Sequence, residues 1–166
     1  MIELQKGIPL IDQHDEHGYW GGKFGGSQIA ESLNYPIEEL TREFEKLRYD
    51  KAFIAERDYY FKNFVGAPTP FIKLNNLTKH LGGAQIYCKL VSKATGGAHK
   101  AYNAVVHALI AKHLGKSFIG GDTGAGYAGK MLSMVSAHFG LKAKIFMGAK
   151  DIERQQINVF SMRSYG

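Results

Sequence analysis

The sequence predicts an α/β fold in which a parallel sheet alternates with crossover helices. Two glycine-rich segments, 95–100 and 121–126, each follow an expected strand and open an expected helix. Three short apolar stretches alternate with longer stretches whose apolar residues recur at helical spacing. Strands that alternate with helices in this way pair in parallel, because each parallel connection needs a crossover.

We divide the chain into two domains. Residues 1–35 form an irregular arm, whose glycines alternate with aromatic residues as in a segment that docks onto another surface. Residues 36–166 form the α/β domain, which begins with a helix at Pro36, a residue favoured in the first turn of a helix. A second helical pattern over 51–64 ends at the glycine and prolines of 66–70.

The rest of the domain carries the alternation of strands and helices. A short helix is capped by Asn75 or Asn76 and ends at Leu81, before two glycines. The expected elements after it are a buried strand over 84–91, a helix over 98–114, a strand over 116–120, a helix over 125–139, a strand over 142–147 and a helix over 151–165. Cys88, the single cysteine, lies in the first of these strands, where we expect an unreactive buried thiol.

Composition excludes several classes of protein. The chain has 166 residues and a net charge of +6, but its cations are scattered and no basic run contains interleaved aromatics. We therefore expect a solvated lysine surface and no nucleic-acid interface. One cysteine excludes an internal disulfide and a cysteine zinc site, and the scattered histidines lack metal-ligand spacing. Because no signal peptide and no membrane-length apolar stretch are present, we expect a cytoplasmic protein.

The first glycine loop ends in a candidate nucleophile. His99 and Lys100 follow the glycines, which places a lysine in the first turn of a helix. The positive end of the helix dipole repels an ammonium there and favours the neutral amine, which reacts with carbonyl compounds. On position alone, Lys100 is also consistent with a solvated lysine and His99 with a capping histidine.

The second glycine loop combines a carboxylate with main-chain donors, and both loops are expected at the edge where open α/β sheets bind ligands. Asp122 opens this loop, and it is also consistent with a helix cap. N–H groups at the start of a helix favour an anion. The loop also matches G-x-G-x-x-G, so a dinucleotide-binding domain stays an alternative, although the acidic residue expected after the next strand is missing. The residues after Asp122 are Thr123, Gly124, Ala125 and Gly126.

Several longer strings resemble the β subunit family of tryptophan synthase. They are Lys23-Phe24-Gly25-Gly26, the segment 62–70, Gly96-Gly97-Ala98-His99-Lys100, the segment 122–126 and the segments 146–155, 158–160 and 162–163. The likeness runs from about Gly18 to the last residue. The chain is therefore identified as a member of this family, and the resemblance implies the N-terminal part of a fold-type II pyridoxal-phosphate enzyme.

The resemblance also implies a reaction and its residues. The family joins L-serine and indole to give L-tryptophan by β-replacement. By this resemblance Lys100 attaches pyridoxal 5'-phosphate, His99 lies against its phosphate, and Asp122 is the acid/base group as serine loses its hydroxyl. The residues that would bind the substrate carboxylate are Thr123, Gly124, Ala125 and Gly126. The implied partners are an α-type subunit and a second copy of the chain.

The chain departs from the family around this site. Asp122 replaces a glutamate, and Tyr102 replaces an asparagine. Tyr127 and Ala128 replace a glutamine and a histidine. The family's phosphate-binding glycine-serine run and its second domain have no counterpart up to Gly166. We therefore expect a chain that is incomplete as an enzyme and active only with its missing half, or else an inactive truncated relative that is a partner-binding or vestigial module.

Overall fold

The structure, a computed structural model, describes residues 5–15, 18–20, 24–26 and 28–166. The chain divides into two units, Met1–Thr41 and Arg42–Gly166. Within the described ranges, no helix has both the length and the apolar character that a membrane span requires.

The first unit is an arm of short elements. They are η1 (Leu10–Asp12), β1 (Tyr19–Trp20), β2 (Phe24–Gly25) and η2 (Glu31–Leu33), with β1 and β2 antiparallel. Trp20 packs within the arm, because its indole Nε1 donates to the carbonyl oxygen of Leu10 at 2.7 Å. Its ring also fills the space beside Gly25, whose φ of 101° a residue with a side chain rarely adopts. Gly21, Gly22 and Lys23 of the expected glycine-aromatic pattern lie outside the described residues.

Most helices and strands lie in the second unit, and α1 (Asn34–Leu47) spans the boundary between the units. The helix begins two residues before Pro36, directly after η2. The elements that follow it are α2 (Lys51–Tyr60), η3 (Phe61–Val65), β3 (Phe71–Lys73), α3 (Asn75–Leu81), β4 (Tyr87–Lys89), η4 (Val91–Lys93), η5 (Thr95–Gly97), α4 (Lys100–His113), β5 (Phe118–Thr123), α5 (Tyr127–His138), β6 (Lys142–Met147), α6 (Ala149–Arg154) and α7 (Gln156–Ser164).

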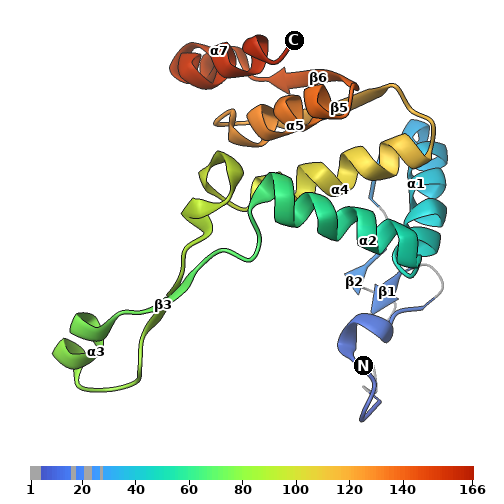
Figure 1. Cartoon of the computed structure of the whole chain (residues 1–166). Coiled ribbons are helices and arrows are strands. Elements are labelled where there is room, and N and C mark those ends of the chain that lie inside the picture. The colour runs from blue at the N-terminus through green and yellow to red at the C-terminus, as the bar shows by residue number, and fades with distance from the viewer. Residues whose placement is uncertain (1–4, 16–17, 21–23, 27) are drawn as a thin grey trace. The chain divides into compact units, whose positions relative to one another are not determined.

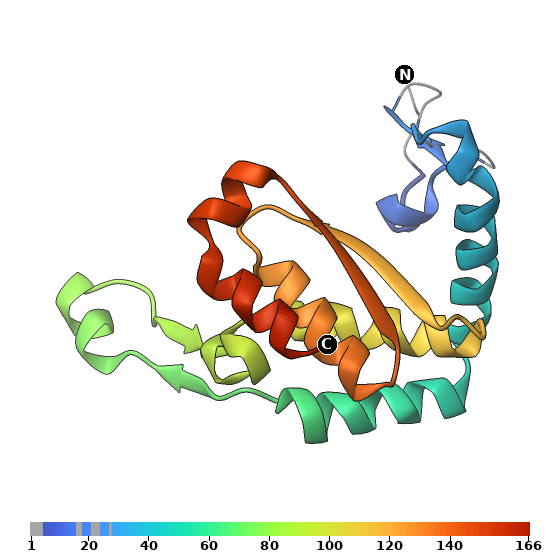
Figure 2. The same cartoon turned by 90° about the horizontal axis from the view of Figure 1, so that it is seen from above.

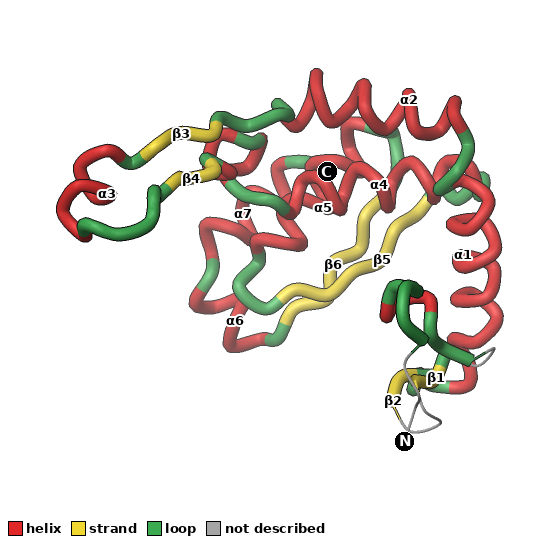
Figure 3. Tube along the Cα trace, turned by 90° about the horizontal axis from the view of Figure 1, so that it is seen from below, coloured by secondary structure: helices red, strands yellow, loops and turns green. Residues whose placement is uncertain are grey.

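The parallel sheet of the described residues has two strands, β5 and β6, which run side by side in Figure 3. They are joined by α5, as the sequence predicts. The strand β5 is longer than the expected 116–120, because its ladder continues through Asp122 and Thr123. The helix expected over 151–165 is two helices, α6 and α7, which separate at Gln155, where φ is −113° and ψ is 37°.

The strand expected over 84–91 is the main correction to the predicted fold. The observed β4 is short and pairs antiparallel with β3, in a hairpin that reaches away from α4 and α5 in Figure 2. The chain turns back at Gly82, whose φ is 64°, and the Thr78 hydroxyl accepts a hydrogen bond from the N–H of Ile86 at 3.0 Å. These local contacts bring β4 alongside β3, so it does not join the parallel sheet.

Two smaller expectations for this hairpin are also wrong. Cys88 is half-buried and does not lie in the core, because β4 has no layer of helices over it. Neither Asn75 nor Asn76 caps α3, since the N-cap position is Leu74 and no side chain bonds to the first turn.

The hydrophobic core of the second unit is centred on α4, which lies between α2 and α5 in Figure 1. On α4, Val105 and Leu109 are fully buried, and on α5 Met131 and Val135 face them. Three alanines of α4 are also buried, which lets its neighbours approach closely; they are Ala101, Ala104 and Ala108. The core therefore fixes the N-terminal ends of α4 and α5 relative to each other.

Leu109→Ala should destabilise the fold. Leu109 has no exposed surface, so the change leaves a cavity and lowers the free energy of unfolding by about 2–5 kcal/mol. Urea denaturation followed by circular dichroism measures the loss. The matched control is Leu81→Ala, since Leu81 is 61% exposed and its removal should change stability by less than about 0.5 kcal/mol. Equal effects of the two changes would contradict the position of the core.

Candidate functional site

The first glycine loop leads directly into α4. Lys100 is the first residue of that helix, as the sequence predicts. Gly96 and Gly97 have φ values of 82° and 84°, a region that favours glycine. A side chain on Gly96 would also collide with the sulfur of Met131 and approach the hydroxyl of Tyr127. The loop is therefore shaped by the first turns of α5.

Tyr127, in the first turn of α5, joins the two glycine loops. Its hydroxyl donates to the carbonyl oxygen of Gly96 at 2.7 Å and lies near the main-chain N–H of Ala98. Partial burial raises the pKa of the Tyr127 phenol, with the Ala98 N–H as a smaller opposing influence, so the hydroxyl keeps its proton at neutral pH. The loops thus meet through the packing of α4 on α5, and not at the ends of neighbouring parallel strands as expected.

The second glycine loop is held from the side of α7. Asn158 donates from Nδ2 to the carbonyl oxygen of Ala125 at 2.8 Å, and its Cβ occupies the space that a side chain on Gly126 would need. The carbonyl of Ala125 and the N–H of Gly126 belong to one trans peptide unit and point in opposite directions. The bond to Asn158 therefore aims the Gly126 N–H away from α7.

The loop offers donors for an anion. In the part of the chain that the structure describes, the main-chain N–H groups of Ala125 and Gly126 have no recorded acceptor. Nothing lies within 4 Å of the position that a side chain on Gly124 would take. The twelve-residue helix α5 begins directly after this loop and adds the positive end of its dipole. A carboxylate or phosphate group fits this arrangement.

The three predicted reactive side chains are accessible. Lys100 is half-buried, and His99 and Asp122 are exposed. Among the described residues, none of these three side chains has a hydrogen-bond or ion-pair partner, and no contact joins Lys100 to Asp122. Since no carboxylate among the described residues pairs with Lys100, its nitrogen is accessible to an aldehyde. An amine for an aldehyde and donors for an anion together fit pyridoxal phosphate and an amino-acid substrate.

Comparison with known proteins places these loops in a family. The profile of the family described as "Pyridoxal-phosphate dependent enzyme" matches residues 63–166, which include every predicted site residue. The chain belongs to this family. Its members depend on pyridoxal phosphate, so the cofactor expected from the sequence is that of the family.

Individual proteins match a larger part of the chain than the family profile does. The tryptophan synthase beta chains of Xanthomonas campestris pv. campestris strains B100, 8004 and ATCC 33913 are each 43% identical to this chain over 161 residues. The matches cover 95% of this chain and 40% of each relative. The resemblance drawn from the sequence strings is confirmed, and the chain spans about 40% of the length of the curated relatives it matches.

Two residues that organise the site were missed by sequence reasoning. Tyr127 directly follows the second loop but has no motif of its own, and its partner Gly96 lies 31 residues away. Asn158 lies 33 residues from Ala125, on a separate helix. Neither spacing carries a local signal, because both bonds depend on how α4, α5 and α7 pack.

Tyr127→Phe should loosen the first loop without disturbing the core. The change removes the bond to Gly96 and the oxygen near the Ala98 N–H, so the amide of Ala98 should exchange with solvent faster, and stability should fall by about 0.5–1.5 kcal/mol. Hydrogen exchange followed by NMR reports on the Ala98 amide. Tyr35→Phe, at a residue 70% exposed, is the control and should leave that rate unchanged. An unaltered Ala98 rate in Tyr127→Phe would show that the hydroxyl does not hold the loop.

Proposed function

We propose that this chain supplies the lysine-bearing and carboxylate-binding part of a pyridoxal-phosphate site that replaces the hydroxyl of L-serine with indole to give L-tryptophan. The observation that supports the proposal is the hydrogen bond from Tyr127 to Gly96, which links the loop of Lys100 to the start of α5, directly after Ala125 and Gly126, whose N–H groups have no recorded acceptor among the described residues. The similar Xanthomonas proteins bear the name of that enzyme. Because the chain spans about 40% of their length, the rest of the site is proposed to come from further polypeptide.

Each loop would have a distinct task. Bound pyridoxal phosphate would supply an electron sink for the charge that develops at the substrate α-carbon. Lys100 would hold the cofactor through its Nζ and would also move a proton at that carbon. His99, directly before Lys100, would lie against the cofactor phosphate. The residues that would bind and orient the substrate carboxylate are Thr123, Gly124, Ala125 and Gly126.

Asp122 would move the proton that accompanies loss of the serine hydroxyl. Its carboxylate lies at the end of β5, directly before the donors, and is exposed. An aspartate is one methylene shorter than the glutamate of the family, so its oxygen atoms reach less far. A misplacement of about 1 Å costs roughly a hundredfold in rate. We therefore propose that loss of the serine hydroxyl is slow in this protein.

The relatives also suggest which protein partners and which compartment to propose for this chain. An α-type subunit and a second copy of the chain are the protein partners that we propose, in the cytoplasm. The alternative function is a non-catalytic module that binds a partner, and it is favoured by the changes that gather at the second loop, Asp122, Tyr127 and Ala128. The dinucleotide alternative has only the glycine pattern to support it, whereas the family match favours pyridoxal phosphate.

Lys100→Ala should abolish covalent attachment of the cofactor. Added pyridoxal phosphate should give the chain the absorbance band of a lysine-bound cofactor, and borohydride reduction followed by mass spectrometry should locate the label on Lys100. The control is Lys112→Ala, because Lys112 lies on the same helix but in its last turn. A folded chain that shows no band, alone or with the C-terminal part of a relative, would favour the non-catalytic module. A label that persists in Lys100→Ala would refute the assignment.

Asn158→Ala should weaken the anion-binding loop. Without the Asn158 amide the Ala125 peptide is free to rotate, so the apparent affinity for L-serine should fall about two- to tenfold. The shift of the Gly126 amide resonance during titration with L-serine measures it. Asn63→Ala is a matched control, because Asn63 makes the same kind of bond, from Nδ2 to the Tyr59 carbonyl at 2.8 Å. Equal affinity in Asn158→Ala and the unaltered chain would remove Asn158 from the site.

A further inference from the structure

The loop that leads to Lys100 is held at its entrance by η3, through a contact between residues 31 apart in sequence. The hydroxyl of Thr95, the first residue of η5, donates to the carbonyl oxygen of Phe64 at 2.5 Å. Phe64 lies at the end of η3, a π-helix whose last carbonyl groups lack partners within the helix. Among the described residues, no other donor to this oxygen is recorded. Thr95 therefore satisfies a carbonyl that the helix itself leaves open.

The same short helix also contacts α4 just after Lys100. The ring of Phe61 meets the ring of Tyr102 edge-on, and the ring centroids are 5.0 Å apart. An edge-on pair of this kind is favourable beyond the surface that it buries. Val65, the last residue of η3, has no exposed surface and belongs to the hydrophobic core. The two contacts of η3 thus lie on either side of Lys100 in the sequence, and Val65 anchors them to the core.

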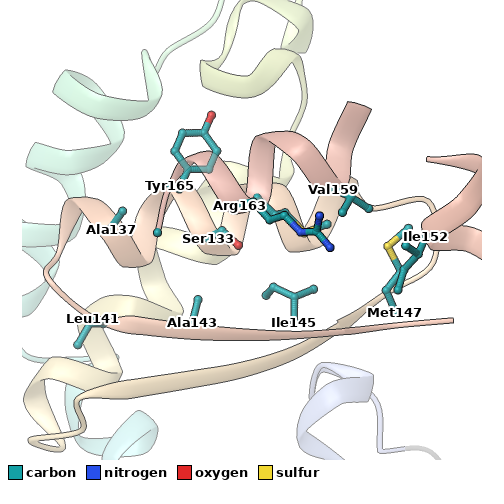
Figure 4. A pocket seen from close by; sticks show the side chains of 12 residues that line it. Ser133, Ala137, Leu141, Ala143, Ile145, Met147, Ile152, Val159, Arg163 and Tyr165 are labelled. Carbon is teal, nitrogen blue, oxygen red and sulfur yellow. The ribbon is translucent and has the colours of Figure 1, made fainter. Parts of the chain in front are cut away.

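The cavity beside α7 takes no part in this arrangement. Figure 4 shows the cavity, which has a volume of about 300 Å³ and is lined mainly by α5, β6, α6 and α7. Ser133 and Ala137 of α5 line it, whereas Met131 of the same helix occupies the space beside Gly96. Helix positions two residues apart point in nearly opposite directions. The cavity and the loop of Lys100 therefore lie on opposite sides of α5.

We infer that Thr95 is a positioning residue for Lys100, and that η3 acts on the lysine through it. This inference rests on the proposed function, because it gives Thr95 a role in the reaction of Lys100 with an aldehyde. Gly96 and Gly97 follow Thr95 and have positive φ values, so the loop has other conformations available when its entrance is free. The Thr95 hydroxyl limits this freedom, and the bond from Tyr127 holds the next residue. The Lys100 amine is thereby confined to a narrow range of positions.

Thr95→Val removes the hydroxyl and keeps the shape of the side chain. Attachment of pyridoxal phosphate to Lys100 should weaken about three- to tenfold, because no hydrogen bond then favours the productive position of the loop. Acetylation of Lys100 by acetic anhydride, in the chain without cofactor, should instead become about two- to fivefold faster, because the half-buried side chain becomes more accessible. Absorbance titration measures the first effect. Mass spectrometry of peptides measures the second, with Lys112 as the internal reference.

Two further variants separate the hydroxyl from other effects of the change. Thr95→Ser keeps a hydroxyl and should return both values to within about twofold of the unaltered chain. Thr41→Val is the matched control and should change neither value, because the Thr41 hydroxyl makes the same kind of bond, to the Ile37 carbonyl at 2.8 Å. An unaltered acetylation rate at Lys100 in folded Thr95→Val would overturn the inference. So would a Thr95→Ser chain that behaves like Thr95→Val.

Tyr102→Leu tests η3 at its other contact and does not depend on whether Thr95→Val folds. The change removes the edge-on pair with Phe61 and should make acetylation of Lys100 about twofold faster. An unaltered rate would show that η3 does not position the lysine. If the unaltered chain attaches no pyridoxal phosphate, the proposed function fails, and the acetylation rates still decide whether Thr95 positions Lys100.

Discussion

The hydrogen bond from the Tyr127 hydroxyl to the Gly96 carbonyl is the contact on which the arrangement of the candidate site depends. Two glycine-rich loops would not by themselves keep Lys100 and the second loop in a fixed arrangement. The bond is possible because α4 and α5 pack closely, with the alanines of α4 at their interface. The bond connects the loop of Lys100 to α5, which packs in the hydrophobic core. The position of this loop therefore depends on the stability of the core.

Local patterns in the sequence predicted the elements that local forces determine. The glycine loops, Lys100 at the start of α4, and β6 at 142–147 all follow from residues close in the chain. The strand expected over 84–91 failed for the opposite reason. Its apolar residues are compatible with a strand in a parallel sheet or in a hairpin. The hairpin forms because of the Thr78 hydrogen bond and the turn at Gly82, and the spacing of apolar residues gives no information about either.

The sequence predicted where the candidate residues lie, but not which side chains hold their loops. Lys100 and Asp122 were singled out from their positions beside glycines and from the family strings, and those residues lie at the ends of α4 and β5. The side chains that hold the loops come from partners 31 and 33 residues away in sequence. Tyr127 also stands where the family has a different residue, so the resemblance gave no role for it. Hydrogen bonds of this kind can be identified only when the packing of the helices is known.

The helix α7 contributes side chains both to the second glycine loop and to a separate cavity. Asn158 holds the Ala125 peptide of the second glycine loop, while Val159 and Arg163 of the same short helix line that cavity. Because both groups lie on one helix of nine residues, a substitution that displaces α7 at the cavity would also displace the amide that holds the Ala125 peptide.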